Sequence, residues 1–175
     1  MVYKKLYEFM SSNYGKEPIW RYHILSVIKY SKKLSSIWKA DKEIVLVAAL
    51  LHDIGRLKKL KQHNISGQEE AKKILTQLNY PKEKIEKVKY CIRLHSANIK
   101  LKRKTPEANC LAQADILSQF DNIDFLFFVA FTNGVNIEKT NQLIRQKLEY
   151  CWKHLDSTSK KIINSKYEAI KKVLR

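Results

Sequence analysis

Residues 48–56 read AALLHDIGR, and the predicted fold depends on this stretch. An apolar helical run ends here in two adjacent side chains that can bind metal, His52 and Asp53, before a glycine, Gly55, that can break the helix. An unpaired carboxylate beside so apolar a segment is costly unless it is neutralised, and a metal ion neutralises it. The stretch therefore predicts half of a metal site at the buried end of a central helix.

Two further potential ligands lie on predicted helices on either side of this stretch. His23 lies beside the apolar stripe of a helix expected over residues 18–38, and Asp115 lies on the apolar face of a helix that Thr105 opens as its N-cap. A lone histidine on such a stripe is more often a hydrogen-bonded core residue. Aspartate, in contrast, is disfavoured inside a helix and more so when it is buried, and a metal ion explains its presence there.

Two of the remaining histidines also lie where a helix would present them. His63 comes just before a predicted helix start, where Ser66 and Glu69 have the spacing of a capping box. His95 lies near the end of a helix expected over residues 81–97, on its apolar side. Each histidine alone is often an ordinary loop or core residue, so only the complete set makes a specific signal.

In chain order the set is His23, His52-Asp53, His63, His95 and Asp115. This order resembles the HD superfamily of metal-dependent phosphohydrolases, which is named after the paired His-Asp, and the resemblance covers residues 20–121. It implies an all-α fold, a single-domain helical bundle of the HD-domain type over residues 1–175 with the metal site at its centre. Residues 20–121 would form the metal-site core, and helices within residues 122–175 would complete the bundle.

The resemblance also implies which residues bind metal. His23, His52, Asp53 and Asp115 match the minimal ligand set of the family, which holds one ion. In its two-metal branches, residues in the positions of His63 and His95 hold a second ion and the aspartate of the His-Asp pair bridges both. Mixed imidazole and carboxylate ligands favour Mn, Fe, Co, Ni or Zn over Mg or Ca, so one or two divalent transition-metal ions are the expected cofactor.

The implied activity is cleavage of a phosphoester or phosphoanhydride bond of a small nucleotide by a metal-activated water, with His52 and Asp53 as catalytic residues. Resembling enzymes include nucleotidases, nucleotide pyrophosphatases and dinucleoside-polyphosphate hydrolases, and the sequence does not choose among them. No glycine-rich phosphate loop is present, which disfavours an ATP-driven kinase. Four basic side chains are candidates for binding the substrate phosphate: Arg56, Lys58, Lys100 and Arg103.

The composition agrees with a helical domain of ordinary size. The chain has 175 residues, enough for a real core, and only four Gly and three Pro for tight turns. It has no apolar run of about 18 residues and no apolar signal-peptide core near its start, so we expect a cytoplasmic protein without a membrane span. The three cysteines are far apart and match no zinc or redox spacing, which predicts reduced thiols at Cys91, Cys110 and Cys151.

The net charge of +17 has two interpretations. Positive charge attracts phosphates, nucleotides or nucleic acid, but lysine here is spread along the chain rather than clustered. Two alternatives to the hydrolase therefore stay open: a basic helical module that binds nucleic acid, and a non-catalytic regulatory HD domain stabilised by metal. The sequence does not determine the oligomeric state.

Other segments have simpler predicted roles. A covering helix is expected near the N-terminus, and Asp41 is expected to cap a helix over residues 42–54. Residues 56–62 read as a basic loop. The aromatic stretch 120–131 is expected to be core or a pocket wall, and two amphipathic helices are expected over residues 136–154 and 159–174.

Overall fold

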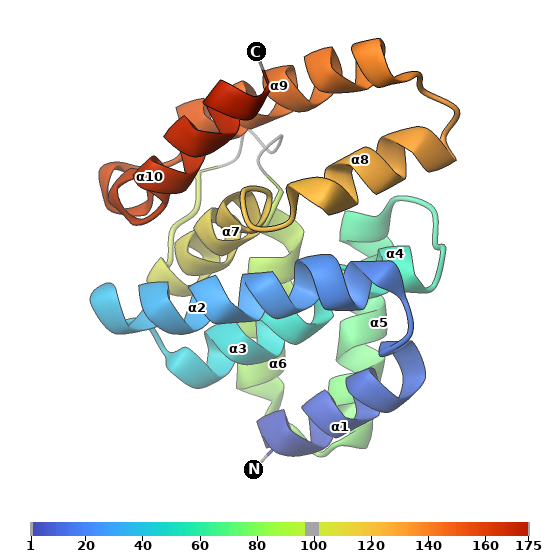
Figure 1. The fold of residues 1–175 in the computed structure, drawn as a ribbon. Coiled ribbons are helices and arrows are strands. Elements are labelled where there is room, and N and C mark those ends of the chain that lie inside the picture. The colour runs from blue at the N-terminus through green and yellow to red at the C-terminus, as the bar shows by residue number, and fades with distance from the viewer. Residues whose placement is uncertain (1, 97–101, 175) are drawn as a thin grey trace. The chain divides into compact units, whose positions relative to one another are not determined.

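The computed structural model describes residues 2–96 and 102–174, and every regular element within these ranges is a helix (Figure 1). The predicted all-α fold is confirmed. The chain divides into two compact units, Met1–Asp115 and Ile116–Arg175. All six predicted metal ligands belong to the first unit.

The first unit is built around α3 (Lys42–Leu51), which packs against α1 (Val2–Tyr14), α2 (Leu25–Ile37) and α6 (Lys82–Leu94). Its side chains are buried without a break from Ile44 to Leu51 because neighbouring helices cover it on several sides. The Asp41 side chain caps the helix as predicted, accepting hydrogen bonds from the backbone N–H groups of Glu43 and Ile44 at 3.0 and 3.2 Å. The apolar run in the sequence is thus the central helix of the unit.

Three further helices complete the first unit. The short α4 (Ile54–Leu57) packs against α5 (His63–Gln77), and α5 packs against α6. The last helix, α7 (Pro106–Ser118), begins in the first unit and continues past its boundary. Thr105 caps it as predicted, since the hydroxyl accepts a hydrogen bond from the backbone N–H of Ala108 at 3.2 Å.

The structure corrects several local predictions around the site. The helix expected over residues 18–38 contains a π-helical turn, η1 (Trp20–Ile24), before α2 begins. The central helix ends at Leu51 rather than at residue 54, and Gly55 lies within α4 instead of breaking a helix. Part of the predicted basic loop is therefore helical.

The predicted capping box at the start of α5 is wrong. The helix already begins at His63, and Ser66 lies inside it. The Ser66 hydroxyl donates to the carbonyl oxygens of Lys61 and Gln62, at 2.9 and 3.3 Å, so it is not available as a cap. The left-handed backbone of Gln62 (φ 49°) turns the chain into the helix instead.

The second unit contains α8 (Ile123–Thr132), α9 (Ile137–His154) and α10 (Ser157–Val173). The Asn136 and Asp156 side chains cap α9 and α10. Aromatic side chains join the helices, because the Tyr167 ring stacks on Trp152 with centroids 4.2 Å apart and meets the edge of Phe120 at 5.7 Å.

The aromatic stretch 120–131, expected to be core or a pocket wall, is core only in part, because Phe120 is buried but the helix α8 is not. This helix has no buried residue, and Phe128 and Phe131 are 50% and 45% exposed. The three cysteines are buried free thiols, as predicted. Within the residues that the structure describes, no helix has the length and apolar character needed to cross a membrane.

Candidate metal centre

Six side chains from five segments of the first unit meet around the end of α3. His23 lies on the π-helical turn, His52 follows α3, and Asp53 forms the turn between α3 and α4. The other three come from later segments: His63 is the first residue of α5, His95 follows α6, and Asp115 lies on α7. They form two ligand groups, His23–His52–Asp115 and Asp53–His63–His95, and within each group the ligand atoms all lie within 4.8 Å of one another.

The first group is centred on His23. Its Nε2 atom lies 3.1 Å from Nε2 of His52 and 3.3 Å from Oδ1 of Asp115. Oδ2 of Asp53 is 3.4 Å from the same His23 nitrogen and 3.7 Å from Nε2 of His52. Two imidazole nitrogens and two carboxylates therefore converge on one small volume, which is a donor set that suits a divalent transition metal.

Asp53 belongs to the second group and also lies beside the first. Oδ1 of Asp53 lies 3.8 Å from Nε2 of His95, whereas Oδ2 faces His23 and His52. The His95 ring is 5.2 Å from the His52 ring and 6.4 Å from the His63 ring, centroid to centroid. Asp53 thus has one oxygen toward each group, which is the placement that a bridging carboxylate needs.

Backbone carbonyl groups orient two of the imidazole rings. Nδ1 of His52 lies 2.8 Å from the Ala49 carbonyl oxygen, and Nδ1 of His95 lies 2.6 Å from that of Ile92. A carbonyl oxygen only accepts hydrogen bonds, so each Nδ1 carries the proton and donates it. Nε2 of each ring is left with a lone pair directed into the site, and such an outer hydrogen bond is usual for a metal-bound histidine.

The electrostatics favour the ligand forms of His52 and Asp53. Burial, helped by the neighbouring His23 and His95, lowers the pKa of His52 to about 4 against the opposing effect of Asp53. Burial alone would raise the pKa of Asp53, but His52, His23 and His95 outweigh it and hold this pKa below its ordinary value. At neutral pH His52 is therefore a neutral imidazole and Asp53 an ionised carboxylate.

A further observation supports the fit of these residues to a metal ion. Nε2 of His63 is buried and has no hydrogen-bond partner within the described parts of the chain. A buried, unsatisfied nitrogen costs free energy unless a ligand occupies it. Its position in a group with Asp53 and His95 makes a metal ion the natural ligand.

The predicted phosphate-binding residues lie in different surroundings. Arg56 is beside the centre: its Nε atom is 2.9 Å from Oδ1 of Asp53, and its side chain is 53% exposed. Lys58 forms an ion pair with Glu70 on α5. Arg103 donates to the carbonyl oxygens of Leu94 and Ser96. Lys100 lies outside the described residues.

The Arg103 contacts were not anticipated from the sequence. Its Nε and Nη2 atoms donate to the carbonyl oxygens of Leu94 and Ser96, at 2.9 and 3.0 Å. These two residues flank His95, so the guanidinium holds the backbone on both sides of a predicted ligand. The sequence shows a charged residue at position 103, but nothing in it identifies the carbonyl groups that this residue contacts.

The role of Gly55 was also missed. A Cβ atom at this position would lie 2.6 Å from the carbonyl oxygen and 2.9 Å from Cα of His63, both backbone atoms. Only glycine lets α4 approach the start of α5 this closely. The sequence shows a glycine two residues after Asp53. A helix break explains such a glycine more simply than a close contact between helices, so the contact was not predicted.

Comparison with known proteins agrees with this geometry. A family model for the HD domain matches residues 20–119, more than half of the chain. The crystal structure of a predicted HD superfamily hydrolase from an uncultured Thermotogales bacterium is similar in fold, with 19% sequence identity and a TM-score of 0.57 over 84% of this chain and 85% of that one. A comparison with curated proteins gave no match. With the His-Asp pair in place and metal-competent residues grouped around it, the chain belongs to the HD domain family.

Proposed function

We propose that this protein hydrolyses a phosphoester or phosphoanhydride bond of a small nucleotide, with water as the nucleophile. The observation that carries the proposal is the pair of ligand groups joined at Asp53, with the exposed cation Arg56 beside them. Two adjacent metal positions and a nearby guanidinium are the features that a phosphoryl-transfer site needs, because negative charge develops on phosphoryl oxygens during the reaction.

We further propose that the centre holds two divalent ions, chosen from Mn, Fe, Co, Ni and Zn. His23, His52 and Asp115 would hold the first ion and His63 and His95 the second, with Asp53 between them. A bound divalent ion supplies Lewis acidity and lowers the pKa of a coordinated water toward neutrality.

The chain itself would orient the substrate and keep the ligands in their reactive form. The carbonyl oxygen of Ala49 fixes the tautomer of His52. Arg56, half-exposed next to Asp53, is placed to leave that carboxylate and bind a phosphoryl oxygen. The three cysteine thiols are buried and belong to neither ligand group, which favours water over a thiol as the nucleophile.

A small nucleotide is the proposed substrate because its phosphates suit both a metal pair and a strongly basic chain. Nucleotidase, pyrophosphatase and dinucleoside-polyphosphate activities differ in their products. A nucleoside and phosphate indicate the first, a nucleoside monophosphate and pyrophosphate the second, and two mononucleotides the third.

The first test is elemental analysis of the purified protein, followed by a product screen over mononucleotides and dinucleoside polyphosphates. Asp53→Ala should lose metal and turnover together, whereas His154→Ala, which changes an exposed histidine outside the site, should keep both. Full turnover in Asp53→Ala at unchanged metal content would rule out the assigned centre. Metal without turnover on any substrate would favour a regulatory HD domain, and neither metal nor turnover would favour the nucleic-acid module.

The two-ion proposal has its own test. His63→Ala and His95→Ala should each lower the metal content from about two ions per chain to about one, because each removes a ligand from the second group only. An unchanged stoichiometry in both variants would mean that the centre binds a single ion through the first group.

A further inference from the structure

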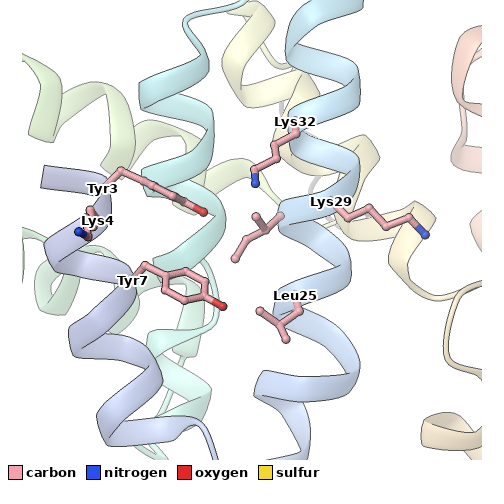
Figure 2. A pocket seen from close by; sticks show the side chains of 7 residues that line it. Tyr3, Lys4, Tyr7, Leu25, Lys29 and Lys32 are labelled. Carbon is pink, nitrogen blue, oxygen red and sulfur yellow. The ribbon is translucent and has the colours of Figure 1, made fainter. Parts of the chain in front are cut away.

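A hollow lies in the first unit, outside the two ligand groups. It has a volume of about 440 Å³ and lies between α1 and α2 (Figure 2). Tyr3 and Tyr7 line it from α1, and Leu25, Ile28 and Lys32 line it from α2. None of these residues belongs to either ligand group, so the hollow is separate from the proposed hydrolytic centre.

The packing of α1 explains why the hollow exists. Leu6 and Met10 of α1 are completely buried, and α1 packs against α3. Tyr3 and Tyr7 lie one helical turn apart on another side, with ring centroids 6.3 Å from each other. The two tyrosines thus face the space beside α2 without filling it.

The lining combines an apolar floor with a polar edge. Ile28 is 5% exposed, and together with the half-buried Leu25 it offers aliphatic surface. Figure 2 shows the hydroxyl groups of Tyr3 and Tyr7 and the ammonium group of Lys32 directed toward the space between the helices. Burial raises the pKa of Tyr3, so its hydroxyl keeps its proton and can donate it.

The charge around the hollow is positive. Lys4 and Lys29 also line it, and no carboxylate does among the described residues. Figure 2 shows Lys29 pointing away, in agreement with the position of its Nζ atom 4.9 Å from the Tyr30 ring centroid. Lys4 lies 4.0 Å from Glu8, an exposed pair that contributes little. Lys32 is therefore the cation best placed to meet a bound anion.

We propose that this hollow is a binding site for a small aromatic oxyanion, that is, a planar ring carrying a phosphate, phosphonate or carboxylate group. The ring would lie between the tyrosine rings and the floor formed by Leu25 and Ile28. The oxyanion would accept hydrogen bonds from Lys32 and the tyrosine hydroxyls. The volume falls within the range usual for small-molecule sites, about 300–1,000 Å³.

Simpler ligands match either the aliphatic surface or the positive charge of this lining, but not both. A neutral apolar molecule would cover the floor but leave the Lys32 ammonium partly desolvated without a counter-charge. An inorganic anion would neutralise Lys32 but leave the aliphatic floor in water. A ring with an attached oxyanion satisfies both requirements, and the tyrosine faces favour an aromatic body over a flexible aliphatic one.

The test uses methyl NMR of the full chain titrated with phenylphosphonate, which has no phosphoester bond to hydrolyse. Leu25 and Ile28 methyl groups report on this hollow, whereas Leu51 and Ile54, adjacent to His52 and Asp53, report on the metal centre. We expect saturable shifts at Leu25 and Ile28 below about 10 mM ligand. No saturable shift there at this concentration would overturn the proposal, whatever happens at the metal centre.

Three further probes separate the parts of the ligand. Methylphosphonate lacks the ring and benzyl alcohol lacks the charge, so both should bind more weakly than phenylphosphonate. Equal binding of either probe would overturn the aromatic oxyanion as the ligand class. Benzoate distinguishes the oxyanions: tighter binding of benzoate identifies a carboxylate ligand, and tighter binding of phenylphosphonate a phosphate-like one.

Lys32→Ala and Lys33→Ala form a matched pair, because both lysines are exposed on α2 and only Lys32 lines the hollow. Lys32→Ala should weaken phenylphosphonate binding about fivefold, and Lys33→Ala should change it little. Tyr7→Phe, which keeps the ring, should weaken binding about twofold to fivefold. Equal affinities in the two lysine variants, together with an unchanged affinity in Tyr7→Phe, would overturn the assigned contacts.

Discussion

His52 is enclosed completely by the protein, and its protonation is therefore coupled to folding. The unfolded chain binds a proton at this residue near pH 6.5, whereas the folded chain resists protonation until pH falls to about 4. Below pH 6.5 the unfolded state thus gains protons that the folded state does not. The free energy of unfolding should decrease as pH falls through this interval, by up to about 3 kcal/mol from His52 alone.

Chemical denaturation of the chelator-treated protein at pH 7 and pH 4.5 measures this loss. His52→Gln should reduce the difference between the two pH values, and the exposed His154→Gln should leave it unchanged. The lowered pKa of Asp53 affects stability in a separate pH range. Its contribution to the free energy of unfolding is lost only below the ordinary aspartate pKa of 3.8. A pH dependence that is identical in wild type and His52→Gln would show that His52 titrates normally.

At the scale of elements, the contact between α4 and α5 places His63 in the centre. Gly55→Ala would put a methyl group within 2.6 Å of the His63 carbonyl oxygen, which is backbone and cannot rotate away. We expect this substitution to cost about 1–3 kcal/mol of unfolding free energy and to lower the occupancy of the second ligand group. Thermal unfolding and elemental analysis measure the two effects.

Gly67→Ala is the matched control for this contact. A Cβ atom there would have its nearest neighbour at 3.6 Å, an ordinary distance, and Gly67 lies inside α5, where alanine is the better helix former. Gly67→Ala should be neutral or stabilising and should keep its metal content. Equal destabilisation by the two substitutions would mean that the helix contact yields easily and does not position His63.

Arg103 should act as a positioning residue for the end of α6. It donates to carbonyl oxygens on both sides of His95, so Arg103→Ala should loosen this ligand and weaken metal binding at the second group about tenfold. Lys102→Ala removes a neighbouring exposed charge without these contacts and should have little effect. Metal titration of both variants checks this, and equal affinities would contradict the positioning role.

These elements also show where sequence reasoning succeeds and where it stops. The central helix and the acids Asp53 and Asp115 could be predicted, because an all-apolar run implies burial on every side and a buried acid implies a partner. His63 and His95 joined the predicted set only through the resemblance to the HD superfamily. The π-helical turn at His23 and the Arg103 contacts could not, since both depend on packing between distant segments. The Ser66 capping box failed for the same reason: local spacing favours a cap there, but the approach of α4 to α5 at Gly55 and His63 moves the helix start.

At the scale of the whole molecule, the chain carries a large excess of positive charge. The chain carries 34 Lys and Arg against 17 Asp and Glu, so 17 positive charges would stay uncompensated even if every acid were paired. Such an excess destabilises the compact state. Salt screens repulsion over distances beyond about 10 Å at 0.1 M, but it weakens close ion pairs much less.

The melting temperature should therefore rise with salt, by a few degrees between about 0.05 and 0.5 M KCl. Scanning calorimetry in KCl and in NaCl tests this while excluding an effect of one particular cation. Replacing three exposed lysines, Lys5, Lys33 and Lys61, with glutamine should flatten the dependence, because it removes part of the repulsion that salt screens. A melting temperature that falls with salt would mean that ion pairs such as Lys58–Glu70 stabilise the fold by more than the charge excess destabilises it.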